Sequence, residues 1–169
     1  MNPTARTPLL SPEHIAMVDK GVSAIVSSCD VQLRPSIMRA MGSSITPDGG
    51  SVTVYLSRRQ SRQLLLDVAA TGRIAVVFSE PLSHQTVQVK ATQTRIRPAQ
   101  ASDEPLLQRY RTAMAHEVAK VGIDARFAHA MFDWQLDDLV AISFEPQEAY
   151  DQTPGPRAGA TLPASGAAP

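Results

Sequence analysis

The chain has 169 residues with a hydrophobic share of 43%, which suits one domain with one core and argues against a second independent domain. Its 16 basic residues balance its 16 acidic ones, so no overall charge would attract nucleic acid or an anionic membrane. A single cysteine, Cys29, excludes an intramolecular disulfide and a thiolate metal cluster within one chain, as is usual in a reducing compartment.

Residues 1–10 contain two prolines and no secretory signal, and they predict a flexible N-terminal segment. A short helix begins at Ser11-Pro12-Glu13, where a hydroxyl N-cap, a proline and an acid follow in the favoured order, and Gly21 ends it. Residues 22–26 then predict a strand. A second strand within 35–45 is expected to pair with the first as a hairpin.

The clearest strand is 51–56, which alternates strictly and places Val52, Val54 and Leu56 on one face. Residues 61–71 change to a helical spacing of apolar residues, and a glycine at 72 ends that helix. The next segment, 74–78, is apolar on both faces and predicts an interior strand.

The second half of the chain begins with a long alternating stretch at 85–96, whose length predicts one strand that bends around a barrel. Two helices are expected at 103–118 and 124–132, and a last strand at 139–144. Residues 151–169 are rich in proline and glycine and predict a loose C-terminal tail.

These elements predict one folded domain at residues 11–150. Six short strands with helices between them, and few places for a parallel crossover, favour a mainly β (α+β) fold, a six-stranded antiparallel barrel with peripheral helices. The chain has no apolar run of the roughly 18 residues that a membrane span needs. We therefore expect a soluble, cytoplasmic protein without a membrane partner.

The turn at residues 57–62 carries an unusual excess of positive charge. It reads Ser57-Arg58-Arg59-Gln60-Ser61-Arg62 and lies where a strand ends and a helix begins. The start of a helix carries a partial positive charge, so each cation there costs about 0.3–1 kcal/mol. A bound anion would reverse that cost, because backbone N–H groups, hydroxyls and guanidinium groups together match phosphate. The alternative is that the arginines are solvated while Ser57 or Ser61 caps the helix.

Arg39 lies in the second predicted strand, where an isolated charge needs a partner or water. It could reach the same anion, or it could be an exposed strand residue. The four histidines show no metal spacing, so we expect no metal site. Cys29 has no evident activating base and is expected to be a small buried hydrophobe.

The order of elements resembles the pyridoxamine 5′-phosphate oxidase-like family of FMN-binding split barrels over roughly residues 13–150. The resemblance rests on the hairpin with Arg39, the alternating strand, Ser61-Arg62, the amphipathic helix and the long strand that begins His84-Gln85. It implies a six-stranded antiparallel split β-barrel that binds FMN as a homodimer, with the flavin in the interface.

The resemblance also implies roles for particular residues. Arg39 and the sequence Ser61-Arg62-Gln63 match the phosphate-binding positions, and Ser57, Arg58 and Arg59 would assist. The flavin ring would lie along the segment from Tyr55 through Leu56 to Ser57, and it would contact Gln85 or Gln88 on the long strand. Contacts from the partner subunit would come from later segments, for which Trp134 and the tail are candidates.

Three departures from the family pattern matter. Gln63 stands where a lysine is common, and no lysine follows Arg39 on its strand. The Arg and His pattern with which the vitamin B6 oxidase binds its substrate is also absent, which argues against that enzyme itself. We therefore expect an FMN-dependent oxidoreductase of unknown substrate. The alternative is a protein on the same barrel that stores or senses flavin or haem without turnover, with His84 or His129 as a haem ligand.

Overall fold

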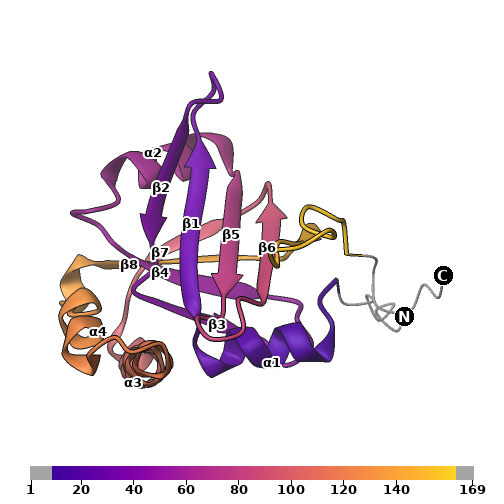
Figure 1. Ribbon diagram of the computed structural model, residues 1–169. Helices are drawn as coiled ribbons and strands as arrows, with labels where there is room; N and C mark the ends of the chain where they lie inside the picture. The colour runs from indigo at the N-terminus through magenta and orange to yellow at the C-terminus, as the bar shows by residue number, and fades with distance from the viewer. Residues whose placement is uncertain (1–8, 163–169) are drawn as a thin grey trace, which may run out of the picture.

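The computed structural model describes residues 9–162 (Figure 1). The predictions for residues 1–8 and 163–169 lie outside this part of the chain. Its α-helices are α1 (Pro12–Lys20), α2 (Arg62–Thr71), α3 (Glu104–Lys120) and α4 (Ala125–Met131), and two 3-10 turns are η1 (Ala101–Asp103) and η2 (Leu136–Asp138). Its strands are β1 (Ser23–Cys29), β2 (Pro35–Arg39), β3 (Gly42–Ile45), β4 (Val52–Ser57), β5 (Ile74–Ser79), β6 (Thr86–Ala91), β7 (Arg95–Pro98), β8 (Leu139–Phe144) and β9 (Glu148–Asp151).

The strands form two antiparallel sheets. One sheet has the order β2-β1-β5-β6-β9 and the other β3-β4-β8-β7. The mainly β, antiparallel fold with peripheral helices is therefore confirmed, and β5 is an interior strand as predicted. The expected count of six strands is wrong, because residues 9–162 contain nine strands in two sheets that do not close into one barrel.

Two of the three additional strands arise because two predicted strands each pass from one sheet to the other, and the third is β9, which the sequence did not predict. Arg39 at the end of β2 pairs with Ile25 of the first sheet, whereas Gly42 at the start of β3 pairs with Tyr55 of the second. In the same way the stretch 85–96 divides into β6 and β7. Neither break carries a Pro-Gly or Asn-Gly turn sequence, so the sequence alone predicts one extended strand for each stretch.

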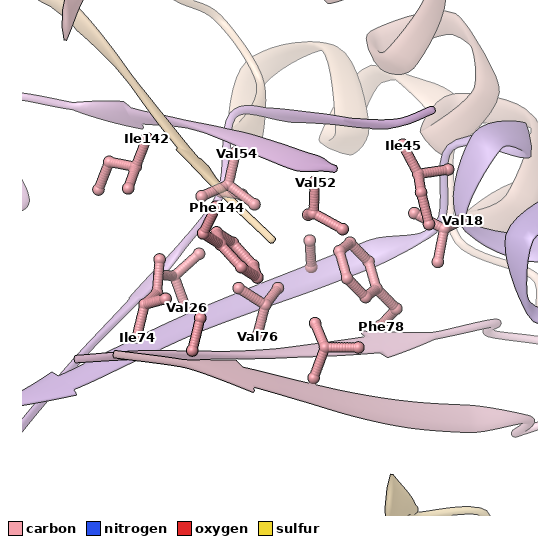
Figure 2. Close-up of a cluster of buried hydrophobic side chains, with 14 of the residues drawn as sticks. Val18, Val26, Ile45, Val52, Val54, Ile74, Val76, Phe78, Ile142 and Phe144 are labelled. Carbon is pink, nitrogen blue, oxygen red and sulfur yellow. The ribbon is translucent and has the colours of Figure 1, made fainter. Parts of the chain in front are cut away.

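The main core lies between the inner faces of the two sheets (Figure 2). Val26, Val76 and Phe78 come from the first sheet and meet Val54 and Phe144 of the second. Both ends of this core are covered by helices, since Val18 of α1 and Leu64 and Val68 of α2 belong to the same buried cluster. The predicted inward face of β4, with Val52, Val54 and Leu56, is confirmed.

A second buried cluster lies on the outer face of the β3-β4-β8-β7 sheet, beneath α3 and α4. Tyr55 of β4 packs there with Tyr110 of α3 and with Phe132, which follows α4. The rings of Tyr110 and Phe132 meet edge to face with 5.5 Å between their centroids. The outer face of the other sheet differs, because no described helix lies over it in Figure 1.

The segment that follows β8 is more ordered than its composition predicts. β9 pairs with β6 at the edge of the first sheet. Residues 152–162 then fold back along this edge, where the Gln152 N–H donates to the Thr86 carbonyl (2.8 Å) and the Leu162 N–H to the Ala149 carbonyl (2.8 Å). The prediction of a loose tail from residue 151 is therefore wrong as far as residue 162. Backbone hydrogen bonds and the packing of Leu162 against the main core hold the segment, and composition reveals neither.

No described helix is long and apolar enough to cross a membrane.

Candidate anion site at the start of helix α2

The turn between β4 and α2 is held by its own backbone and by Ser57. The Ser61 N–H donates to the Ser57 carbonyl (2.9 Å), and the Gln60 N–H donates to Ser57 Oγ (3.3 Å). These bonds reverse the chain directly at the end of β4, so that α2 begins at Arg62. The predicted change from strand to helix is confirmed.

Asp138 of η2 binds this turn, and sequence reasoning did not find it. Its carboxylate accepts from Ser57 Oγ (2.6 Å) and from the Arg59 N–H (3.1 Å), and its carbonyl accepts from the Arg58 N–H (2.7 Å). The Arg59 Nε lies 3.5 Å from the same carboxylate. The turn therefore contacts one acid, although none occurs in its own sequence. Only the antiparallel pairing of β4 with β8, which brings Ser57 opposite Leu139, could have revealed it.

The first turn of α2 lacks the groups that normally stabilise the start of a helix. Ser61 occupies the N-cap position, but its side chain makes no capping hydrogen bond, and the first turn holds no acidic residue. The Ser61 side chain is buried, with 2% of its residue surface exposed, and its Oγ has no hydrogen-bond partner among residues 9–162. The start of α1 is conventional by comparison, because Ser11 Oγ accepts from the His14 N–H and Glu13 lies in the first turn.

Three exposed arginines surround this uncapped helix end: Arg58, Arg59 and Arg62. Only Arg59 has an ion pair within the described part of the chain, and that pair is the contact with Asp138. A doubly charged oxyanion would accept from the free N–H groups of the first turn and from a guanidinium group. The buried hydroxyl without a partner and the missing acid both fit a phosphate at this position.

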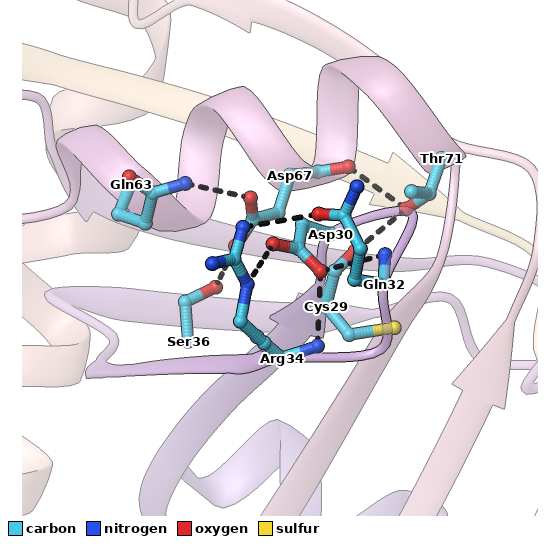
Figure 3. Close-up of polar contacts among 8 residues, drawn as sticks. All are labelled: Cys29, Asp30, Gln32, Arg34, Ser36, Gln63, Asp67 and Thr71. Atoms are coloured by element: carbon cyan, nitrogen blue, oxygen red, sulfur yellow. Dashed lines mark hydrogen bonds and ion pairs between the residues drawn. The ribbon is translucent and has the colours of Figure 1, made fainter.

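Gln63, which stands where the family commonly has lysine, is directed toward another helix residue (Figure 3). Its amide donates to Asp67 Oδ1 (2.8 Å), and Ser36 of β2 donates to Asp67 Oδ2 (2.6 Å). Asp67 is buried, so the Ser36 bond fastens α2 to β2 from the inner side of the strand, and the Gln63 amide satisfies the other carboxylate oxygen. The Gln63 side chain therefore serves the anchoring of α2 and is not directed to an anion at the start of the helix.

Arg39 does not join the turn. Ser36 and Met38 face α2 and the core, and the alternation of a strand places Arg39 on the opposite face of β2. There its guanidinium group donates to Ser23 Oγ (3.1 Å) on the outer face of the sheet. The expectation that Arg39 reaches the same anion as Ser61 is not supported by this arrangement.

Gln88 shares this outer face with Arg39. The register aligns Arg39 with Ile25, Val77, Gln88 and Tyr150 in one row across the sheet. Gln85 lies just before β6, where its carbonyl accepts from the Glu80 N–H (2.9 Å). The predicted site residues therefore fall into two groups, one at the start of α2 and one on the outer face of the β2-β1-β5-β6-β9 sheet.

Tyr55 and Leu56 are both buried, so a flavin ring along this strand would meet their backbone and not their side chains. Leu56 belongs to the main core with no exposed surface. The Tyr55 hydroxyl donates to Asp103 (2.9 Å) beneath α3. Burial, with the hydrogen bond to Asp103, raises the pKa of Tyr55 to about 12. Neither side chain can reach a surface ligand without repacking of its surroundings.

Trp134, expected to act across a subunit interface, lies beside the turn of its own chain. It lines a cavity of about 240 Å³ together with Ser57, Arg59 and Asp138. No group of three or more His, Cys, Asp or Glu side chains in the described residues could hold a metal ion.

Comparison with known proteins identifies the fold. No protein-family profile matches the sequence, and no curated protein matches it. Among solved structures, HupZ of Group A Streptococcus has a TM-score of 0.54 at 13% identity, and the match covers 89% of this chain and 99% of HupZ. A candidate pyridoxamine 5′-phosphate oxidase of Lactobacillus delbrueckii has a TM-score of 0.52 at 12% identity, covering 88% and 97%. An F420 reductase has a TM-score of 0.54 at 14% identity, covering 79% and 93%. The chain therefore shares the pyridoxamine 5′-phosphate oxidase-like split-barrel fold of these solved structures.

Proposed function

We propose that this chain is an FMN-binding oxidoreductase that holds the flavin phosphate at the start of α2. One observation carries the proposal: the buried Ser61 hydroxyl has no partner and stands at a helix start without a capping bond or an acid. A buried hydroxyl without a hydrogen bond costs about 1–3 kcal/mol, so a ligand that supplies an acceptor is favoured there. The solved structures that share the fold include a candidate pyridoxamine 5′-phosphate oxidase and an F420 reductase, which support a redox function.

The proposed phosphate position lies on the helix side of the turn. Asp138 already accepts the N–H group of Arg59 and repels a second anion from that part of the turn. The N–H groups at the start of α2, the Ser61 hydroxyl and the Arg62 guanidinium group remain for a ligand. Arg62 is therefore the cation expected to contribute most, and Arg58 would add charge from the turn.

FMN would supply the hydride or electron chemistry when bound, and the residues of the chain bind and orient it. We place the dimer contact on the outer face of the β2-β1-β5-β6-β9 sheet. Ile25 and Val77 form an apolar row there between Arg39 and Gln88, and Ile37 beside them is 66% exposed. Such a face is stabilised when a second copy covers it. Arg39 and Gln88 would then contact the flavin from this face.

The phosphate position is tested by replacing Arg62 with alanine and titrating the full chain with FMN and with riboflavin. Only FMN carries the phosphate, so Arg62→Ala should weaken FMN by about 1.5–3 kcal/mol and riboflavin little. Arg109→Ala is the matched control, because this exposed arginine pairs with Asp19 of α1 (3.1 Å) and not with the turn. Equal losses for both ligands would place the phosphate elsewhere.

Catalysis and storage are distinguished by a second measurement. The FMN-loaded protein is mixed anaerobically with a reduced nicotinamide cofactor, and the flavin absorbance is followed. We expect the flavin to be reduced, as an oxidoreductase requires. A bound flavin that stays oxidised with physiological donors would instead assign the chain to flavin binding without turnover.

A further inference from the structure

One serine connects the turn at residues 57–62 with the acid that binds it. Ser57 Oγ donates to Asp138 Oδ2 (2.6 Å) and accepts from the Gln60 N–H (3.3 Å). A hydroxyl has a single proton, so the bond to Asp138 sets the direction in which Ser57 can accept. Ser57 is buried, and water does not readily replace either partner. The orientation of the Asp138 carboxylate is therefore passed on to the backbone of the turn.

Asp138 occupies the N–H groups of the turn itself. Its carbonyl accepts from the Arg58 N–H (2.7 Å), and its carboxylate accepts from the Arg59 N–H (3.1 Å). Through Ser57 it also orients the hydroxyl that accepts from the Gln60 N–H. The N–H groups that remain for a ligand lie in the first turn of α2, because the first N–H groups of a helix have no partner within it. An anion is therefore directed past the turn to the start of the helix.

Asp138 has two effects of opposite sign on an anion at this position. Its negative charge repels the anion, but the Arg59 Nε at 3.5 Å offsets part of that charge and salt screens the remainder. Its hydrogen bonds hold the turn in one conformation, and a site that is fixed before the ligand arrives loses less conformational entropy on binding. Hydrogen bonds to an ionised group are also stronger than neutral ones. We expect the effect of the hydrogen bonds to exceed that of the charge.

We infer that Asp138 is the positioning residue of the anion site, and that it acts through Ser57. It does not contact the ligand. It fixes the turn between β4 and α2 so that an anion meets the start of α2 and not the turn. The effect of Asp138 on phosphate binding rests on the proposed function, whereas the fixing of the turn is a property of the chain without a ligand.

The first measurement follows amide hydrogen exchange of the turn by NMR in the full chain without flavin. Ser57→Ala removes the acceptor of the Gln60 N–H only. It should nevertheless speed exchange of the Arg59 N–H about five-fold, because the Asp138 carboxylate loses the bond that orients it. Asp138→Ala should likewise speed exchange of the Gln60 N–H. Asp137→Asn, at an exposed neighbour, is the control that should change neither amide. Faster exchange only at the amide that lost its own acceptor would overturn the inference.

The second measurement titrates two variants with FMN and with riboflavin. Asp138→Asn and Asp138→Ala remove the same charge, but asparagine keeps one acceptor oxygen. FMN should bind about five-fold more weakly to Asp138→Ala, with Asp138→Asn between it and the unsubstituted chain, and riboflavin should change little. Tighter FMN binding in both variants would show that the charge dominates and would overturn the inference. An unsubstituted chain that does not prefer FMN would contradict the proposed function instead, and the exchange measurement would still decide the role of Asp138.

Discussion

Asp103 gathers four hydrogen bonds from three parts of the chain. Arg97 of β7 donates to both carboxylate oxygens (2.7 and 2.8 Å), Tyr55 of β4 donates through its hydroxyl (2.9 Å), and the Gln100 N–H donates as well (2.8 Å). The carboxylate therefore fastens the start of α3 to the second sheet. The Arg97 guanidinium holds the pKa of Asp103 at about 2, below its ordinary 3.8.

Acid should remove this contribution to stability. The pKa of Asp103 is lowered from 3.8 to about 2 in the folded chain, so the unfolded chain binds the proton more tightly. The contribution, about 2 kcal/mol, is complete above about pH 4 and is lost as the pH falls through 2. Urea unfolding of Asp103→Asn should show a flatter dependence between pH 4 and 2 than the unsubstituted chain, with Asp137→Asn as control. The same acid dependence in Asp103→Asn would contradict this role.

At the level of single residues, only part of the candidate site could be predicted from the sequence. The charge at residues 57–62 marked the turn, because cations at a helix start are visible in the sequence. The role of Asp138 could not be predicted, since its contact with the turn depends on the pairing of β4 with β8. The direction of Arg39 was equally hidden, because the face on which a strand residue lies depends on which side the core and α2 take.

Two of the helix ends that use glycine in the left-handed conformation differ in what surrounds them. Gly72 ends α2 at φ +68°, and a Cβ placed there would lie 2.4 Å from the Thr92 carbonyl oxygen. Gly122 follows α3 at φ +80° with no atom within 4 Å of such a Cβ. The close approach at Gly72 lets α2 meet the segment between β6 and β7, where the chain passes between the sheets.

Alanine substitutions at these two glycines should therefore differ in cost. Gly122→Ala adds only the strain of a positive φ, about 1–2 kcal/mol. Gly72→Ala adds the same strain and a clash with backbone, about 2–5 kcal/mol in total. The free energies of unfolding in urea measure both. Equal losses would show that α2 can move away from Thr92 without cost.

Helix ends were easier to predict than strand ends for a physical reason. The start of α1 at Pro12 and the ends of α1 and α2 follow from local residues that cap or break a helix. β9 and the division of 85–96 depend instead on pairing with distant strands. Alternation reports that a segment is extended, but it does not report which sheet the segment joins.

At the scale of the whole molecule, one sheet face carries apolar side chains that no described helix covers. Helices cover both ends of the core and the outer face of the second sheet, whereas Ile25 and Val77 remain partly exposed on the first. We propose that the subunit contact lies there, and that the second copy completes the binding site of a flavin beside it.

A charge in the middle of this face should separate the subunits. Val77→Lys places an ammonium group in the apolar row. The free energy needed to bury this charge in a dimer exceeds the free energy that the apolar contact contributes. Light scattering after size exclusion should show a dimer for the unsubstituted chain and a monomer for Val77→Lys. Thr112→Lys, on the exposed side of α3, is the control that should stay dimeric. A dimer that survives Val77→Lys would move the contact to another face.

The central claim is that the start of α2 holds the phosphate of a flavin. The most direct measurement is the absorption spectrum of the protein as purified, followed by fluorescence titration with FMN and riboflavin. The account predicts a bound or bindable flavin, with FMN preferred over riboflavin by at least about ten-fold, the ratio expected for one charge-assisted phosphate contact. A colourless protein that quenches neither FMN nor riboflavin fluorescence, or one that binds both equally, would contradict it.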